Sequence, residues 1–325
     1  MQKYERFCLF AHYDRLGGIT DHVLFYLAAL QNCGFKTVLV SNSHLSSAAQ
    51  EKLSGLTVDV MIRPGKGLDF ASHAIGFAKH QGSVGGLLLL ANDSVFGPLG
   101  ELREVVEKLL NVDADVYGMV ESHEIATHLQ SWFLIIRPSV YRHPAFTVFL
   151  AQDFQLMSKE EVIINGELGF SAMLRREEFC VHAHYRQNLG PINYLLGGVN
   201  PTTTALWKNL ILRHDVPFIK IQLLRDNPEG ITGLDEWREL VSTKSSGLAA
   251  MIWGHLQREV AGVGGKDSLR CRGNSLRLGS HAILILVDHT YRQGARQVSQ
   301  ILFFIYKLLR VSERRLSKWI LWNQS

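Results

Sequence analysis

The chain has 325 residues, of which 46% are hydrophobic and 20% are charged, and its formal net charge is +4. This length and composition indicate one large folded domain, or one main domain with a smaller appendage, and exclude an intrinsically disordered chain. The net charge is too small to indicate a nucleic-acid-binding protein, so we expect no nucleic-acid partner.

The cysteines and the apolar segments indicate the compartment. Four cysteines lie far apart in the sequence and form neither a CxxC pair nor a zinc-binding spacing. The opening residues MQKYERF show no secretory signal, and no apolar run reaches the about 20 residues that a membrane-spanning helix needs. We therefore expect a cytoplasmic protein.

Strand and helix patterns alternate in the first part of the chain. Strands are predicted at residues 7–11, 37–41, 58–62, 87–91 and 116–120. Helices are predicted between them at about 20–33, 46–53, 69–80 and 99–110. This alternation is typical of right-handed crossovers in a largely parallel sheet that helices cover on both faces.

The pattern changes after residue 120. The segment HLQSWFLII at 128–136 predicts one strand that bends back beside the sheet. Helices are then predicted near 139–152 and over about 166–176, with a short strand at 178–182. We divide the chain into a core at 1–190, a helical extension of it at 191–260, a Gly/Ser/Arg-rich linker at 261–280 and a final helix at 281–325.

The final helix is basic and amphipathic. Its apolar residues recur at mostly helical spacing, basic residues from Lys307 to Lys318 are interleaved with them, and Trp319 and Trp322 lie near the end. This composition is typical of a helix that lies in a membrane surface. The alternative is a terminal helix that packs on the core or on a second subunit.

The strand at 87–91 ends abruptly in polar residues. Four leucines precede Asn92, Asp93 and Ser94, and the turn-forming pair Gly97-Pro98 follows. Ligands of open α/β sheets bind just beyond the carboxyl ends of the strands, where a carboxylate can hold a phosphate-bound metal ion or a sugar. The alternative is that Asn92 and Asp93 only cap the next helix and shape the turn.

Polar groups follow the other early strands as well. His12 and Asp14 come after the first strand, Ser41-Asn42-Ser43 after the second, and the segment from Gly67 to Phe70 after the third. Because parallel strands end at the same edge of a sheet, these groups are expected to line one continuous cleft. For Asp14 the alternative is a turn in which its side chain bonds nearby backbone.

The order of these blocks resembles the nucleotide-sugar-dependent glycosyltransferases of the GT-A fold. More specifically, it resembles the rhamnan synthesis protein F family, which builds rhamnose-containing bacterial surface polysaccharides. The resemblance spans roughly residues 6–228. Its blocks are HYD (12–14), VSNS (40–43), GLDF (67–70), NDSVFGP (92–98), HLQSWF (128–133), ELG (167–169), PFIK (217–220) and LLRDNP (223–228).

The resemblance implies a GT-A-like, Rossmann-type mixed and mainly parallel sheet, with helices on both faces and a mostly helical C-terminal extension. It implies transfer of a sugar to a lipid-linked polysaccharide acceptor, with dTDP-L-rhamnose as the favoured donor. The enzyme would then work at the cytoplasmic face of the inner membrane, where the basic C-terminal helix would bind the membrane surface.

The resemblance also assigns the donor side of the cleft. Asp93 takes the position of the residue that binds the metal or the donor diphosphate. The other donor-binding positions are His12, Asp14, Gly67, Asp69, Phe70, Asn92 and Ser94. The usual motif has two acids, and here Asn92 stands where one is expected. A single carboxylate binds Mg²⁺ or Mn²⁺ weakly unless the phosphates supply most ligands, so the alternative is that Lys or Arg side chains and backbone N–H groups neutralise the diphosphate. Lys220 and Arg225 are candidates for contacting phosphate, and the alternative for both is a solvated basic face.

On the acceptor side, Glu167 takes the position of the catalytic base at the start of a helix. An inverting displacement needs a base that deprotonates the acceptor hydroxyl. The alternative is that Glu167 only stabilises the helix through its dipole. His128, Gln130 and Ser131 are expected to contact the sugar or the acceptor, or else to be buried polar groups bonded to backbone.

Two other classes of protein are alternatives to a glycosyltransferase. A non-catalytic scaffold of the polysaccharide assembly machinery with a glycosyltransferase-like fold is favoured by the missing second acid. A nucleotide-binding dehydrogenase is disfavoured, because YDRLGG replaces G-x-G-x-x-G after the first strand and no G-x-S-x-G motif is present.

Overall fold

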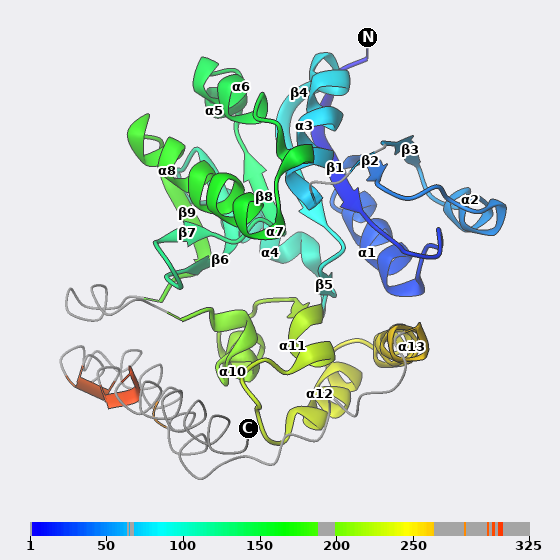
Figure 1. Cartoon of the computed structure of the whole chain (residues 1–325), viewed down its shortest axis with the longest axis vertical. Coiled ribbons are helices and arrows are strands. Elements are labelled where there is room, and N and C mark those ends of the chain that lie inside the picture. Colours follow the sequence, from blue (N-terminus) through cyan, green and yellow to red (C-terminus); the bar gives the residue numbers. More distant parts are fainter. Residues whose placement is uncertain are drawn as a thin grey trace, which may run out of the picture.

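The computed structural model describes residues 2–63, 65, 68–187 and 199–262, together with a few residues between 283 and 307 (Figure 1). Nearly all of the predicted linker at 261–280 and of the predicted helix at 281–325 lies outside the described residues.

A mixed, mainly parallel sheet forms the centre of the molecule. In spatial order its strands are β3 (Val58–Ile62), β2 (Lys36–Ser41), β1 (Tyr4–His12), β4 (Val84–Asn92), β8 (Phe133–Ile136), β6 (Val116–Ser122) and β7 (His128–Leu129), with β9 (Val181–Tyr185) also paired to β6. Strands β1 to β4 are mutually parallel, and β9 is parallel to β6. Strand β8 runs antiparallel between β4 and β6. The predicted fold class is confirmed.

Helices cover both faces of the sheet. On one face lie α1 (Asp21–Asn32) and α4 (Leu102–Leu110), and on the other lie α3 (Leu68–His80), α6 (Pro144–Leu150) and α8 (Gly169–Arg176). Alternate residues of β1 belong to the two cores, with Cys8 and Phe10 in one and Phe7 and Leu9 in the other. This is the alternation that a strand buried on both faces requires.

The segment at 128–136 differs from the prediction of a single strand. It forms two short strands, β7 and β8, with residues 130–132 between them. At the break the backbone N–H of Ser131 donates to Glu167 Oε1 at 3.3 Å, and a hydrogen bond from backbone to a side chain competes with continuous strand pairing. The indole N–H of Trp132 donates to the side-chain oxygen of Gln130 at 2.7 Å, and both side chains are buried.

The predicted helices after residue 136 are also divided. The helix expected at 139–152 is split into α5 (Pro138–Tyr141) and α6 because Pro144 starts the second piece, where its missing N–H is tolerated. The helix expected over 166–176 starts much earlier, with a capping box at Ser158, and runs through α7 (Lys159–Val162), a π-helical turn at Ile163–Leu168 and α8. Glu167 therefore lies inside the π-helical turn and does not open a helix.

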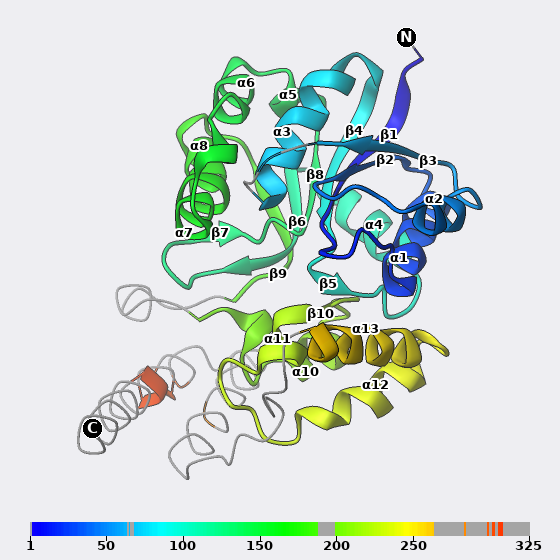
Figure 2. The same ribbon diagram turned by 45° about the vertical axis from the view of Figure 1, so that its right-hand side comes forward.

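The described part of the extension is mostly helical. It contains α10 (Trp207–Arg213), β10 (Ile219–Lys220), α11 (Ile221–Asp226), α12 (Trp237–Lys244) and α13 (Leu248–Gly262), gathered below the sheet in Figure 2. It has its own core, to which Phe96 of strand β5 (Val95–Phe96) also belongs. Because β5 pairs with β10 and follows β4 directly, the carboxyl end of β4 lies against the extension. The short helix α2 (Ser47–Leu53) lies beside β3, at the far edge of the sheet (Figure 1).

Within the described ranges, we find no helix with the length and apolar character that crossing a bilayer requires.

The π-helical turn packs against the core at Gly166. A Cβ atom on Gly166 would lie 2.5 Å from the ring of Phe70, which is itself buried. We expect Gly166→Ala to lower the free energy of unfolding by about 1–3 kcal/mol, because a tightly packed ring must move. Chemical denaturation monitored by circular dichroism measures this loss.

The matched control is Gly254→Ala in α13, where a Cβ meets no heavy atom within 4 Å. This change should raise stability by about 0.5–1 kcal/mol, since alanine favours the helix. An unaltered stability in Gly166→Ala would contradict the packing described for the π-helical turn.

Candidate functional site

Asn92 connects the end of β4 to helix α3. Its side-chain Nδ2 donates to Asp69 Oδ2 at 2.8 Å, while its Oδ1 accepts from the backbone N–H and the hydroxyl of Ser94 at 3.1 and 2.5 Å. Helix α4 is preceded by Glu101, which makes no side-chain cap. The interpretation of Asn92 and Asp93 as caps of that helix is therefore wrong.

Asp69 is the centre of the site. Its Oδ2 accepts from Asn92 and also from the Ser131 hydroxyl, at 2.9 Å. The residue lies in the first turn of α3, and the fully buried Arg63 fixes that turn by donating to Leu68 O and to the Ser72 hydroxyl, both at 2.7 Å. Asp69 thus joins the end of β4 to the segment between β7 and β8.

Ser131 continues the network to Glu167. Its hydroxyl lies 2.6 Å from Glu167 Oε1, and its backbone N–H donates to the same oxygen at 3.3 Å. The second oxygen, Oε2, lies 3.7 Å from His128 Nε2. His128 Nδ1 contacts the carbonyl of Ala126 at 2.7 Å, and since a carbonyl only accepts, Nδ1 carries a hydrogen. The Glu167 side chain is 22% exposed, so it is fixed on one side and open on the other.

Asp93 follows Asn92 and contacts the loop after β1. Its Oδ2 accepts from the backbone N–H of Tyr13 at 2.8 Å. Burial raises the pKa of Asp93 to about 7; the nearby Asp69 also raises it, whereas the Tyr13 N–H and Lys220 lower it. An acid with this pKa is only partly ionised at neutral pH, so a cation at Asp93 would stabilise its charged form.

Lys220 and Ser94 complete the network at its other end. Lys220 Nζ donates to the Ser94 hydroxyl at 3.0 Å. Burial lowers the pKa of Lys220, and the charges of Glu167, Asp69 and Asp93 act against this. Of the two basic residues considered for phosphate in the sequence, Lys220 belongs to the site, while Arg225 is paired with Asp226.

His12, the last residue of β1, and Asp14, in the loop that follows, lie beside this network. His12 Nδ1 contacts the Ser41 hydroxyl at 3.0 Å, and burial, together with the charge of Arg258, lowers the pKa of His12 to about 4, so the ring is neutral at pH 7. Asp14 accepts from the backbone N–H groups of Leu16 and Gly18 at 2.8 and 3.0 Å, which is the predicted turn. Asp14 also forms an ion pair with Arg258.

Arg258 is a residue that the sequence analysis missed. It lies in α13, which comes after the last block of the resemblance, and no motif marks it. Only the packing of α13 against α1 brings it to the loop after β1.

Two of the predicted contact residues, Phe70 and Gln130, do not present free groups to a ligand. Phe70 is 1% exposed and packs in the core, so its ring does not line the cleft. Gln130 is buried and its amide is used by Asn200, Thr202 and Trp132, because it connects the sheet to the extension. Gly67 lies outside the described residues.

The described residues contain no cluster of three or more His, Cys, Asp or Glu side chains that could hold a metal ion. Asp93 is nevertheless suited to a cation that has phosphate ligands of its own. One of its oxygens bonds Tyr13, the other accepts no hydrogen bond from another described residue, and burial disfavours its charge in the absence of a cation.

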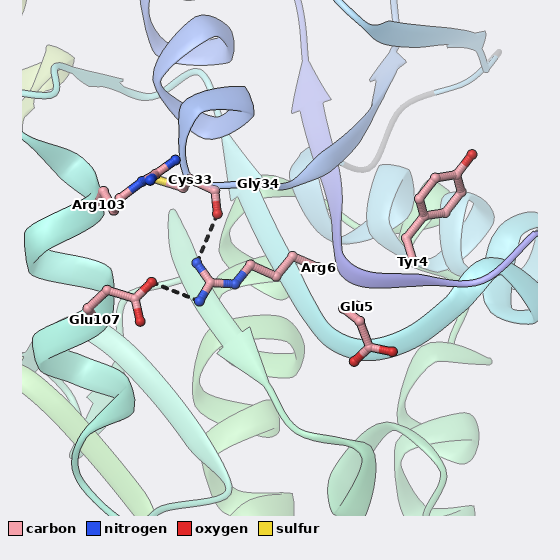
Figure 3. A pocket seen from close by; sticks show the side chains of 7 residues that line it. All are labelled: Tyr4, Glu5, Arg6, Cys33, Gly34, Arg103 and Glu107. Atoms are coloured by element: carbon pink, nitrogen blue, oxygen red, sulfur yellow. Dashed lines mark hydrogen bonds and ion pairs between the residues drawn. The ribbon is translucent and has the colours of Figure 1, made fainter.

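A separate pocket of about 410 Å³ lies at the opposite end of the sheet (Figure 3). Its lining includes Tyr4, Glu5 and Arg6 at the start of β1. The Arg6 guanidinium donates to Cys33 O at 2.8 Å and to Glu107 at 2.7 Å, so it ties α1 and α4 to the strand. None of the predicted site residues lines this pocket.

The sequence profile of one known protein family matches more than half of the chain. The sequence profile of a family described as rhamnan synthesis protein F matches residues 37–262. The chain belongs to this family. Membership of the family supports a glycosyltransferase-like function, and the match extends beyond residue 228, where the resemblance in the sequence ended, to the end of α13.

Comparisons with individual proteins give remote similarities. The chain is similar to the inositol-1-phosphate CTP transferase from T. maritima, with 12% sequence identity and a TM-score of 0.35 over 56% of this chain and 86% of that one. It is also similar to the glycosyltransferase GlyE from Streptococcus pneumoniae TIGR4, with 11% identity and a TM-score of 0.38 over 80% of this chain and 64% of that one. No curated protein sequence matches the chain.

The raised pKa of Asp93 predicts a pH-dependent stability. Between the ordinary value of 3.8 and about 7, the folded protein binds more protons at Asp93 than the unfolded chain does. The contribution of Asp93 to the free energy of unfolding therefore falls as the pH rises through this window. Asp93→Asn removes this loss, so the variant should be more stable than wild type at pH 8, by up to about 3 kcal/mol.

Urea unfolding of both proteins at pH 4 to 8 measures the difference, which should shrink toward the acid end. Asp113→Asn, at an exposed position, is the matched control, and its stability difference should vary less with pH than that of Asp93→Asn. A difference between wild type and Asp93→Asn that is constant over the whole range would contradict the buried, unpaired state of Asp93.

Proposed function

We propose that the chain is a glycosyltransferase that moves a sugar from a nucleotide-sugar donor, with dTDP-L-rhamnose favoured, to a lipid-linked bacterial surface polysaccharide. Family membership supports the general activity, and the name of the family supports rhamnose. The observation that carries the proposal is the placement of Glu167. Its carboxylate is held by Ser131, partly exposed, and connected through Asp69 and Asn92 to the carboxyl end of β4.

In the proposed reaction Glu167 is the general base of an inverting transfer. It takes the proton of the acceptor hydroxyl while that oxygen forms a bond to the anomeric carbon, and the bond from this carbon to the diphosphate oxygen breaks with its electron pair. The proton ends on Glu167 and the nucleoside diphosphate leaves. Ser131 orients Oε1 through its hydroxyl and its backbone N–H, and His128 Nε2 lies 3.7 Å from Oε2.

Asp93 would hold Mg²⁺ or Mn²⁺ at the donor diphosphate. Such an ion neutralises the charge that builds up on the leaving phosphates. Asp69 lies close enough to Asp93 to raise its pKa, which makes the site more favourable for a cation. With Asn92 in place of a second acid, the phosphates would supply most of the remaining ligands.

The acceptor and the membrane complete the proposal. A lipid-linked acceptor at the cytoplasmic face of the inner membrane suits the basic, tryptophan-containing segment at 281–325, whose composition favours an anionic membrane surface. In this arrangement the protein is peripheral, and the segment brings the cleft close to the polysaccharide.

A non-catalytic scaffold with the same fold is the second candidate. The observation that favours it is Asn92, whose side-chain nitrogen and oxygen both bond within the protein, at a position where the usual motif has an acid. Donor turnover separates the two candidates, because a scaffold does not release nucleoside diphosphate from a nucleotide sugar.

The first test is turnover by Glu167→Gln. With dTDP-L-rhamnose and an acceptor, release of dTDP should fall by about 10²–10⁴-fold, because the amide cannot take a proton, while donor binding stays unchanged. Glu160→Gln, an exposed neighbour in α7, is the matched control and should retain full activity. Unchanged turnover by Glu167→Gln would assign the base to another residue, and absence of turnover and donor binding in wild type would favour the scaffold.

The second test is removal of divalent metal. We expect EDTA to lower dTDP release by about tenfold or more, and Mg²⁺ or Mn²⁺ to restore it, since the ion compensates charge on the leaving group. In Asp93→Asn the metal should no longer restore activity. Full activity of wild type in EDTA would exclude a metal from the reaction.

A further inference from the structure

Lys220 is a charged group inside the site with few partners. Its Nζ donates to the Ser94 hydroxyl, yet among the described residues no carboxylate lies within 4 Å of it. An ammonium group has three hydrogens to donate, and one bond leaves the others unused. Taking a charge out of water without a close counter-ion is costly, so such a group is stabilised by a bound anion.

The position of Lys220 is fixed by backbone on both sides. In the pairing of β10 with β5, Lys220 lies opposite Val95, and the next residue, Ile221, donates its N–H to Ser94 O at 3.0 Å. The side chain also passes the indole ring of Trp132, with Nζ at 6.0 Å from the ring centroid. Its ammonium group is therefore held beside residues 92–94, at the carboxyl end of β4.

The other basic residues of the extension near this edge are already paired. Arg258 forms an ion pair with Asp14, and Arg225 is bound by both Asp226 and Glu259. The acids around Lys220 act on it only from a distance: Glu167, Asp69 and Asp93 keep it charged without neutralising it by direct contact. Lys220 differs from both arginines because its charge is available to a ligand.

We propose that Lys220 binds the diphosphate of the donor directly and stabilises the negative charge of the departing nucleoside diphosphate. The inference rests on the proposed function, and it adds a cationic residue from the extension to a donor site otherwise composed of acids and amides. In this role Lys220 acts through charge and hydrogen bonds and transfers no proton.

The test is calorimetric titration with inorganic pyrophosphate, dTDP and thymidine, each in Mg²⁺ and separately in EDTA. Wild type should bind both diphosphates. In Lys220→Met their affinity should fall by about 10- to 100-fold, the loss typical of a charge-assisted hydrogen bond, while the affinity for thymidine stays the same. Lys220→Arg should retain part of the affinity. The matched control, Lys52→Met, removes an exposed lysine that is paired with Asp21 and should bind like wild type.

A second measurement needs no variant. Acetylation of lysines by a mild reagent, followed by mass spectrometry, should show Lys220 protected by pyrophosphate and Lys52 unprotected. Equal diphosphate affinity in wild type and Lys220→Met, or equal acetylation of Lys220 with and without pyrophosphate, would overturn the proposal and leave the glycosyltransferase function standing. Pyrophosphate binding that depends on Lys220 without turnover of any nucleotide sugar would support the anion site and overturn the proposed function instead.

Discussion

The site depends on one shared carboxylate oxygen, Asp69 Oδ2, which accepts from both Asn92 and Ser131. Without it the end of β4 and Glu167 have no direct connection in the network. The Ser131 hydroxyl lies within hydrogen-bond distance of two carboxylates, those of Asp69 and Glu167, but it has only one hydrogen to donate. The hydroxyl donates to one carboxylate at a time, while Asn92 also donates to Asp69 and the backbone N–H of Ser131 also donates to Glu167.

The surrounding fold holds these charges in an unfavourable state. Asp93 is kept where burial opposes its ionisation, and Lys220 is kept where burial opposes its protonation. Folding the rest of the chain supplies the free energy for this, through two cores on the faces of the sheet and a third in the extension. Charged groups whose burial opposes ionisation are characteristic of binding sites, because a bound ligand can provide the missing counter-charges.

Much of the sheet follows from periodicity alone. The strand at 58–62 and the helix after Thr20 need only local pattern, and the position of Asn92 at a strand end predicts its place in the cleft. The π-helical turn around Glu167 could not be predicted, because it depends on Gly166 packing against Phe70, a contact between distant parts of the chain. The same holds for Gln130, whose partners Asn200 and Thr202 lie 70 and 72 residues away.

The charges also explain why the extension belongs to the site. The core provides the acids Asp69, Asp93 and Glu167, whose charges act on Lys220 from β10 of the extension. Arg258 from α13 pairs with another acid of the core, Asp14. An acidic edge alone repels a diphosphate, and a metal held by one carboxylate offsets only part of that repulsion. The family match runs through both elements to residue 262, as expected if the fold needs the extension to accept its ligand.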